Sequence, residues 1–108
     1  MKLAIVGAGV AGSYLGNRLQ GQGHQIEVFE ASKKDSHWPV CAWGASKNML
    51  EIFSKNAGLD FENYVLHRGK KLRMDLPENN IEYLELKGLV TYDKYHWEQD
   101  LCKELSIL

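Results

Sequence analysis

The sequence predicts a single α/β domain with a parallel sheet, on the basis of three features near its start. A short apolar run at residues 3–6 ends in glycine, which is the pattern of a strand buried on both faces of a parallel sheet. From Val10 the apolar spacing changes to that of a helix, and residues 26–30 then have the pattern of a second strand. Strand, helix and strand in this order form a β-α-β unit, whose crossover is expected to be right-handed.

The remaining elements are predicted from apolar spacing and turn residues. The first helix has one apolar face and ends at Gly21 and Gly23, and that face is made of Ala11, Tyr14, Leu15 and Leu19. Residues 32–39 are polar and aperiodic, which predicts a loop. A second helix is expected after the N-cap Ser46, with Gly58 as its terminator, and its apolar face is made of Met49, Leu50, Phe53 and Ala57.

A hairpin and a last helix are predicted in the second half of the chain. Residues 64–76 have the pattern of a hairpin around Gly69, and residues 81–86 and 89–92 predict two more short strands. The final amphipathic helix is predicted from the spacing of Trp97, Leu101, Leu105 and Leu108. The chain contains no repeat, linker or low-complexity segment.

The composition is that of one ordinary globular domain, with 44% hydrophobic and 25% charged residues among 108. Thirteen Lys and Arg against 14 Asp and Glu give a net charge of −1, which lacks the positive charge of a nucleic-acid-binding protein. The longest uncharged stretch, residues 3–17, is too short and glycine-rich for a transmembrane helix. Cys41 and Cys102 form no CxxC motif or disulfide framework, so a cytoplasmic location is expected. The four histidines lack the spacing of a zinc site, and no bound metal is expected.

The strongest functional signal is a glycine-rich turn between the first strand and the first helix. Its glycines form a GxGxxG pattern in the context that dinucleotide binding requires, at Gly7, Gly9 and Gly12. Gly7 permits the tight turn, Gly9 lets the backbone approach a pyrophosphate, and Gly12 lets helix and strand pack closely. The helix N-terminus, with its free N–H groups and partial positive charge, then faces the phosphates. The fold class predicted is therefore a Rossmann-like FAD- or NAD(P)-binding domain.

Glu30 stands at the end of the second strand, with seventeen residues between it and Gly12. At this position a carboxylate accepts hydrogen bonds from an adenosine ribose. A 2′-phosphate would lie against its negative charge, so FAD or NAD is expected rather than NADP.

Two further motifs resemble a particular family of flavoproteins. The segment up to Glu30, extended by Gly16, looks like the fingerprint of FAD-dependent oxidoreductases, and Val40-Cys41-Ala42-Trp43-Gly44 follows it after a short loop. This arrangement, with Thr91-Tyr92-Asp93-Lys94 before an aromatic-rich helix, resembles the geranylgeranyl reductase family. Members of that family are FAD-dependent enzymes of lipid biosynthesis that saturate isoprenoid chains, and the resemblance covers nearly the whole chain.

The resemblance implies FAD as cofactor and a set of residues that contact it: Ala11, Glu30, Cys41, Ala42, Gly44 and Lys94. The family usually has arginine at the position of Lys94, and lysine offers a point charge in place of a planar fork. Cys41 beside a flavin is also the candidate for contact with substrate. From the residues alone, Cys41 is equally well explained as a small buried hydrophobe, and Cys102 is expected to be buried packing.

The resemblance also implies that residues 1–108 are the N-terminal part of one FAD-binding domain, with a prenylated lipid as substrate of the larger protein. A parallel sheet needs more than two strands to bury both faces, so exposed apolar surface is expected. The chain would supply only the adenosine and pyrophosphate sites and part of the flavin-ring site, so no turnover by the chain alone is expected. A flavoprotein monooxygenase and a non-catalytic dinucleotide-binding module remain alternative functions.

Two surface features allow a functional and a structural interpretation. One is a local excess of positive charge that fits either a solvated hairpin, which is favoured, or peripheral contact with an anionic membrane: His67, Arg68, Lys70, Lys71 and Arg73. The other is the pair Trp38 and Trp43, which flank Cys41 and either line an apolar tunnel for a prenyl chain or contribute packing area.

Overall fold

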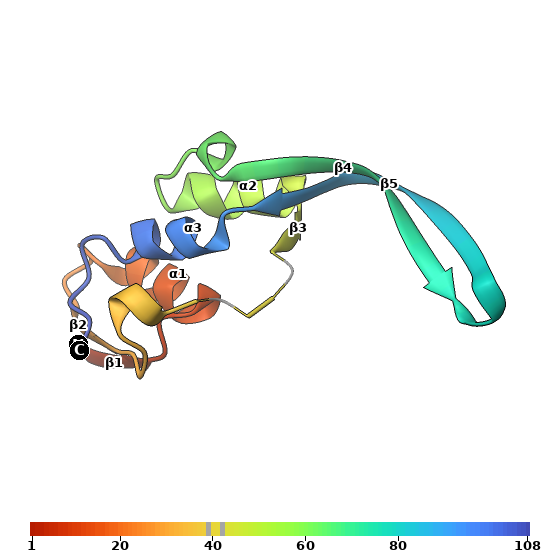
Figure 1. Cartoon of the computed structure of the whole chain (residues 1–108). Helices are drawn as coiled ribbons and strands as arrows, with labels where there is room; N and C mark the ends of the chain where they lie inside the picture. Colours follow the sequence, from red (N-terminus) through yellow and green to blue (C-terminus); the bar gives the residue numbers. More distant parts are fainter. Residues whose placement is uncertain (39, 42) are drawn as a thin grey trace.

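A computed structural model describes residues 1–38, 40–41 and 43–108 of the chain. It begins with a small parallel sheet (Figure 1), in which β1 (Lys2–Val6) pairs with β2 (Gln25–Phe29). The helix α1 (Val10–Leu19) connects the two strands. In the register of the sheet, Ile5 lies opposite Val28, and both side chains are buried. The predicted β-α-β unit is confirmed.

Residues 106–108 extend the parallel sheet on the other edge of β2. The Val28 N–H donates to the Ser106 carbonyl at 3.1 Å, and the Leu108 N–H donates to the Val28 carbonyl at 2.7 Å. The prediction of a helix that continues to Leu108 is therefore wrong, because α3 (Lys94–Leu101) ends before this segment. The free edge of β2 has unpaired backbone N–H and C=O groups. Residues 106–108 pair with these groups as a strand, whereas a further turn of α3 would leave them unpaired.

One face of the parallel sheet is covered and the other is exposed. On the covered face Ile5 and Val28 pack with Ala8 and Cys102. On the other face Val6 is 87% exposed and Phe29 is 40% exposed. The burial on both faces that the apolar run at residues 3–6 predicts is thus wrong for one face within the described residues. The expected exposure of apolar surface is confirmed.

A second sheet is antiparallel and has the strand order β3-β5-β4. It consists of β3 (Gly44–Ser46), β4 (Val65–Leu76) and β5 (Asn80–Tyr92), and the last two form a long hairpin that projects from the body of the molecule (Figure 1). The projection explains a radius of gyration of 16.8 Å, against about 13 Å for a compact chain of this length. On one face of the outer hairpin Leu72 lies opposite Leu84.

The predicted hairpin turn is wrong, because the chain reverses at residues 77–79 and not at Gly69. Gly69 is not a turn but lies inside β4 opposite Leu89, next to a register shift. The turn lies instead at the short 3-10 helix Pro77–Asn79, where Glu78 and Asn79 have positive φ angles of 64° and 58°. Proline and asparagine are turn residues, so the chain reverses there, and the strands predicted at 81–86 and 89–92 are one continuous β5.

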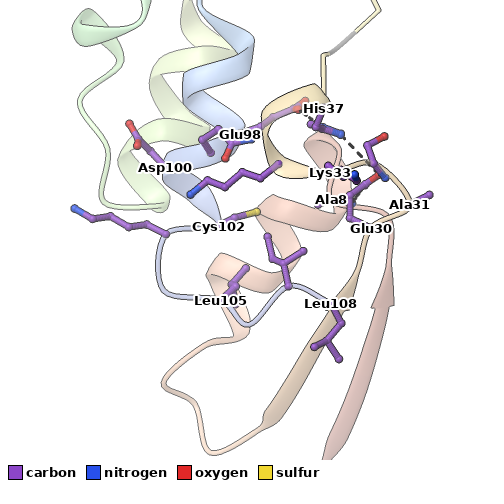
Figure 2. Close-up of a pocket in the computed structure, with 15 residues that line it drawn as sticks. Ala8, Glu30, Ala31, Lys33, His37, Glu98, Asp100, Cys102, Leu105 and Leu108 are labelled. Atoms are coloured by element: carbon purple, nitrogen blue, oxygen red, sulfur yellow. Dashed lines mark hydrogen bonds and ion pairs between the residues drawn. The ribbon is translucent and has the colours of Figure 1, made fainter.

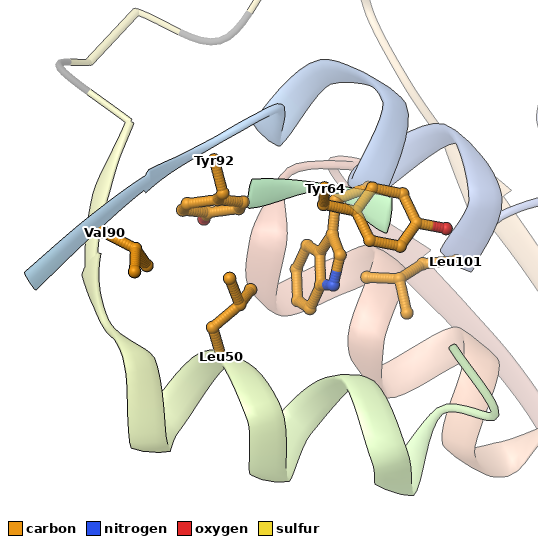
Figure 3. Packing of buried hydrophobic residues seen from close by; sticks show 6 residues of the cluster. Leu50, Tyr64, Val90, Tyr92 and Leu101 are labelled. Carbon is orange, nitrogen blue, oxygen red and sulfur yellow. The ribbon is translucent and has the colours of Figure 1, made fainter. Parts of the chain in front are cut away.

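The larger core lies between the second helix, α3 and the base of the hairpin (Figure 3). The helix α2 (Lys47–Asn56) contributes Leu50, and α3 contributes Trp97 and Leu101. Tyr64, Val90 and Tyr92 complete the cluster. Two further 3-10 helices, Lys34–Ser36 and Phe61–Asn63, lie in the connections. Cys102 is 8% exposed, which confirms its prediction as a packing residue.

Ser46 begins α2 as an N-cap, as the sequence predicts. Its Oγ accepts a hydrogen bond from the Met49 N–H at 3.1 Å. Ser46→Ala is expected to lower the free energy of unfolding by about 1 kcal/mol, because this N–H loses its partner. Urea unfolding followed by circular dichroism measures the loss. Ser46→Asp is the matched control, since aspartate also caps helices and should retain the stability of the original protein. An unchanged urea midpoint in the alanine variant would contradict the capping role.

Candidate functional site

The glycine-rich turn brings the end of β1 against the end of β2. The Gly7 N–H donates to the Phe29 carbonyl at 2.7 Å, and Gly7 has a φ of +97°. Residues with a Cβ rarely adopt this conformation, so glycine is needed for the turn. Gly12 meets a different restriction, since a Cβ there would lie 1.9 Å from the Gly7 carbonyl oxygen. Gly12 therefore permits close packing of α1 against the turn, which is the role expected from the motif.

The space beside Gly9 is open, whereas Gly12 is in close contact with the turn. Among the described residues, no heavy atom lies within 4 Å of a Cβ placed on Gly9, which is the N-cap of α1. No described side chain caps this helix end, and its first N–H groups have no partners within the helix. Ala11, in the first turn, is exposed. The helix end is thus accessible to an anion, which its partial positive charge would stabilise.

The Glu30 carboxylate lies beside this turn (Figure 2). Oε2 accepts from the Ala8 N–H at 2.8 Å, and Oε1 accepts from the Ser32 N–H at 2.9 Å. These two backbone donors, Ala8 first, lower the pKa of Glu30 below its ordinary value, so the group is ionised at neutral pH. An ionised carboxylate has about four acceptor positions, so two remain for hydroxyl groups of a ligand.

A cavity of about 770 Å³ opens next to Glu30. One wall is the segment that follows β2, and the other is the end of α3 with the residues after it; lining residues from the two walls include Glu30, Ser32, His37, Glu98, Cys102 and Leu105 (Figure 2). Burial, and then the negative charges of Glu98 and Glu30, raises the pKa of the Cys102 thiol to about 11. Cys102 is therefore a neutral wall of the cavity at physiological pH.

Cys41 lies next to the first turn of α3 and is exposed. Its Sγ accepts from the Trp43 N–H at 3.2 Å and lies 3.6 Å from Lys94 Nζ, so the structure brings these two predicted residues together. Gly44 opens β3, opposite Thr91 of β5. Ala42, the other residue expected to contact the cofactor, lies outside the described residues. The rings of Trp38 and Trp43 are 5.0 Å apart between centroids.

His37 and Glu98 lie between Glu30 and Lys94, and so connect the Glu30 part of the site with the Cys41–Lys94 part. The sequence does not single out either residue for the site. His37 Nδ1 lies 3.7 Å from Glu30 Oε1, and its Nε2 lies 3.3 Å from Glu98 Oε2. Glu98 Oε1 in turn lies 3.6 Å from Lys94 Nζ. The sequence does carry one signal for this pairing, which is the (i, i+4) spacing of Lys94 and Glu98 on the last helix.

Two classes of site receive no support from the part of the chain that the structure describes. No group of three or more His, Cys, Asp or Glu side chains there is arranged to hold a metal ion. No described helix has both the length and the apolar character needed to cross a bilayer. The basic residues of β4 are largely exposed, and two of them form ion pairs, Arg68 with Glu62 and Arg73 with Asp75.

Comparison with known proteins agrees with this geometry. Residues 5–34 match a family model described as an NAD(P)-binding Rossmann-like domain. No curated protein sequence matches the chain. Among solved structures, a geranylgeranyl bacteriochlorophyll reductase-like protein from Thermoplasma acidophilum is similar, with a TM-score of 0.71 and 17% sequence identity. The match covers 96% of this chain and 28% of that one, so the chain spans less than a third of its length.

The comparisons confirm the fold predicted from the sequence. The chain has a Rossmann-like α/β fold, in which a parallel β-α-β unit is joined to an antiparallel sheet. The predicted resemblance to geranylgeranyl reductases is confirmed at the level of this fold.

Proposed function

We propose that this chain is the FAD-binding portion of a flavin-dependent oxidoreductase, with double bonds of polyprenyl lipids as its substrate class. The observation that supports the proposal best is the joint placement of Gly9 and Glu30. The accessible end of α1 offers N–H groups to a pyrophosphate, and the ionised Glu30 offers acceptors to a ribose. Both groups belong to the adenosine diphosphate half of a dinucleotide.

The choice of FAD over NADP follows from charge. Glu30 is ionised and next to the expected ribose, where a 2′-phosphate would be repelled. The choice of FAD over NAD is supported by the resemblance of the segment around Cys41 and Gly44 to flavoproteins, together with the contact between Cys41 and Lys94. The similar solved structure is described as geranylgeranyl bacteriochlorophyll reductase-like, and this name supports a prenyl substrate.

The residues of this chain would bind and orient the cofactor. Gly9 and Ala11 would lie along the pyrophosphate, Glu30 would accept from ribose hydroxyls, and Cys41, Gly44 and Lys94 would contact the flavin half. Ala42 belongs to the same proposed set. Flavins supply hydride-transfer chemistry when bound, while the protein provides position and electrostatics. Cys41 is the residue of this set proposed to contact the substrate as well.

Glu30→Gln tests the ribose contact. We expect ADP and FAD affinity to fall by about tenfold or more, because a hydrogen bond to a charged acceptor contributes about 1.5–3 kcal/mol. Discrimination against 2′,5′-ADP should weaken at the same time, since the repelling charge is gone. Isothermal titration calorimetry measures both. Glu27→Gln, on the exposed side of the same strand, is the matched control and should leave the affinities unchanged.

Titrating the unmodified protein with FAD, NAD and NADP tests the cofactor itself. FAD should bind most tightly and NADP least. Unchanged ADP affinity in the Glu30→Gln protein would contradict the proposed contact between Glu30 and the ribose. Tighter binding of NAD than of FAD would contradict FAD as the cofactor. The substrate class is tested on the larger protein that the proposal implies. With FAD bound there, a geranylgeranyl lipid should alter the visible flavin spectrum, whereas isopentenol should not. No spectral difference between them would contradict the prenyl substrate class.

A further inference from the structure

Glu98 is a buried carboxylate that the proposed cofactor site does not use directly. It is 2% exposed, and it lies on α3 between Lys94 and His37. Burial of a carboxylate is unfavourable unless the group is paired, and Glu98 Oε1 has no hydrogen-bond partner among the described residues. The cationic Lys94 at 3.6 Å and the imidazole of His37 at 3.3 Å offset this cost. A buried charge between these two partners therefore points to a specific role.

Three other contacts join the same face of α3 to the segment after β2. The Tyr95 hydroxyl donates to the Lys34 carbonyl at 3.4 Å, and the Tyr95 ring stacks on Trp38 with 5.4 Å between centroids. Lys94 reaches Cys41. Together with the contact from Glu98 to His37, these interactions tie residues 34–38 and Cys41 to the first two turns of α3. Glu98 is the only buried residue of this set, because Lys94 and Tyr95 are partly exposed.

We propose that Glu98 is a positioning residue that clamps the 31–38 segment and the Cys41 side of the site onto α3. It acts through His37 on one side and Lys94 on the other. His37 lies next to Glu30, and Ser32 of the same segment donates to the Glu30 carboxylate. Through the one buried carboxylate of Glu98, the clamp thus holds two parts of the site in place: the Glu30 part, which is proposed to bind the ribose, and the Cys41 part. For its effect on the cofactor, the inference rests on the proposed function.

Limited trypsin digestion tests the clamp without any nucleotide. Proteases cut segments that open locally, and Lys33 and Lys34 lie within the clamped segment. Glu98→Gln keeps the shape of the side chain but removes its charge, and should increase cleavage after Lys33 and Lys34 about tenfold. Cleavage after Lys70 and Lys71, on the distant hairpin, is the internal reference and should not change. Glu104→Gln, an exposed acid just after α3, is the matched control.

A cooperative urea-unfolding transition followed by circular dichroism shows whether the variant is folded. Should Glu98→Gln unfold, His37→Ala removes the same contact from the partly exposed side and should also raise cleavage after Lys33 and Lys34. If neither folded variant raises it, the clamp is wrong. ADP affinity is measured in parallel: a several-fold loss in the Glu98→Gln protein supports the positioning role. Faster cleavage with no nucleotide binding in any variant supports the clamp and contradicts the proposed function.

Discussion

Replacing Gly12 by alanine is expected to destabilise the protein by about 3 kcal/mol or more, at the upper end of the cost of overpacking. The new Cβ would lie 1.9 Å from the Gly7 carbonyl oxygen and 3.2 Å from Ile5 Cγ2. The oxygen cannot move aside easily, because the Gly7 N–H is bonded to Phe29 and the Gly7 backbone already has a positive φ. α1 must therefore separate from the turn. Urea unfolding measures the loss.

Gly9→Ala is the matched partner of this substitution. Its φ of −70° suits any residue, and no described atom lies near the added Cβ, so stability should change by less than about 0.5 kcal/mol. Affinity for ADP should nevertheless fall at least tenfold, because the methyl group occupies the space proposed for the pyrophosphate. A Gly12→Ala protein with the original urea midpoint would contradict the packing argument. A Gly9→Ala protein with the original ADP affinity would contradict the location of the pyrophosphate.

Trp97→Ala is expected to cost about 3–5 kcal/mol of unfolding free energy, as large aromatic truncations in cores do. Trp97 is 3% exposed and packs edge-on against Tyr92 with 5.9 Å between ring centroids. Its Nε1–H donates to Ser54 Oγ at 2.9 Å, which ties α3 to α2. Truncation leaves a cavity between these helices and a buried hydroxyl without its donor. Chemical unfolding followed by far-ultraviolet circular dichroism measures the change.

Two other tryptophan substitutions separate the contributions. Trp97→Phe keeps an aromatic ring but loses the Ser54 hydrogen bond, so its cost should be smaller, at about 1–2 kcal/mol. Trp38→Ala should cost less than about 1 kcal/mol, because Trp38 is 64% exposed. A Trp97→Ala protein that loses no more stability than the Trp38→Ala protein would show that the α2–α3 core does not depend on Trp97.

The N-terminal half of the fold could be predicted from the sequence because its signals are local. The apolar runs, the glycine spacing and Glu30 each depend on neighbours within one β-α-β unit. The position of the hairpin turn cannot be predicted in this way, because Gly69 and Pro77 are both turn signals and only the pairing of β4 with β5 decides between them. The helical spacing extends through residues 106–108, whereas their pairing partner, Val28, is distant in the sequence and leaves no local signal.

In the candidate site, too, local motifs could be predicted from the sequence and contacts between distant segments could not. Gly7, Gly9, Gly12 and Glu30 lie together as the motif predicts. Glu98 could not be found in this way, because its role depends on His37 and Lys94, which approach it from different segments. A charged residue on an amphipathic helix is usually solvent-exposed, and nothing in its spacing shows that tertiary packing buries it.

The pairing of residues 106–108 with β2 has a consequence for the order of folding. The β4–β5 hairpin closes through a three-residue turn, and such hairpins form in about 1–10 microseconds. The parallel sheet, in contrast, gains its third segment only when the chain has closed a loop from Val28 to Ile107. The hairpin can therefore form before residues 106–108 join the sheet, although β1 and β2 come earlier in the sequence.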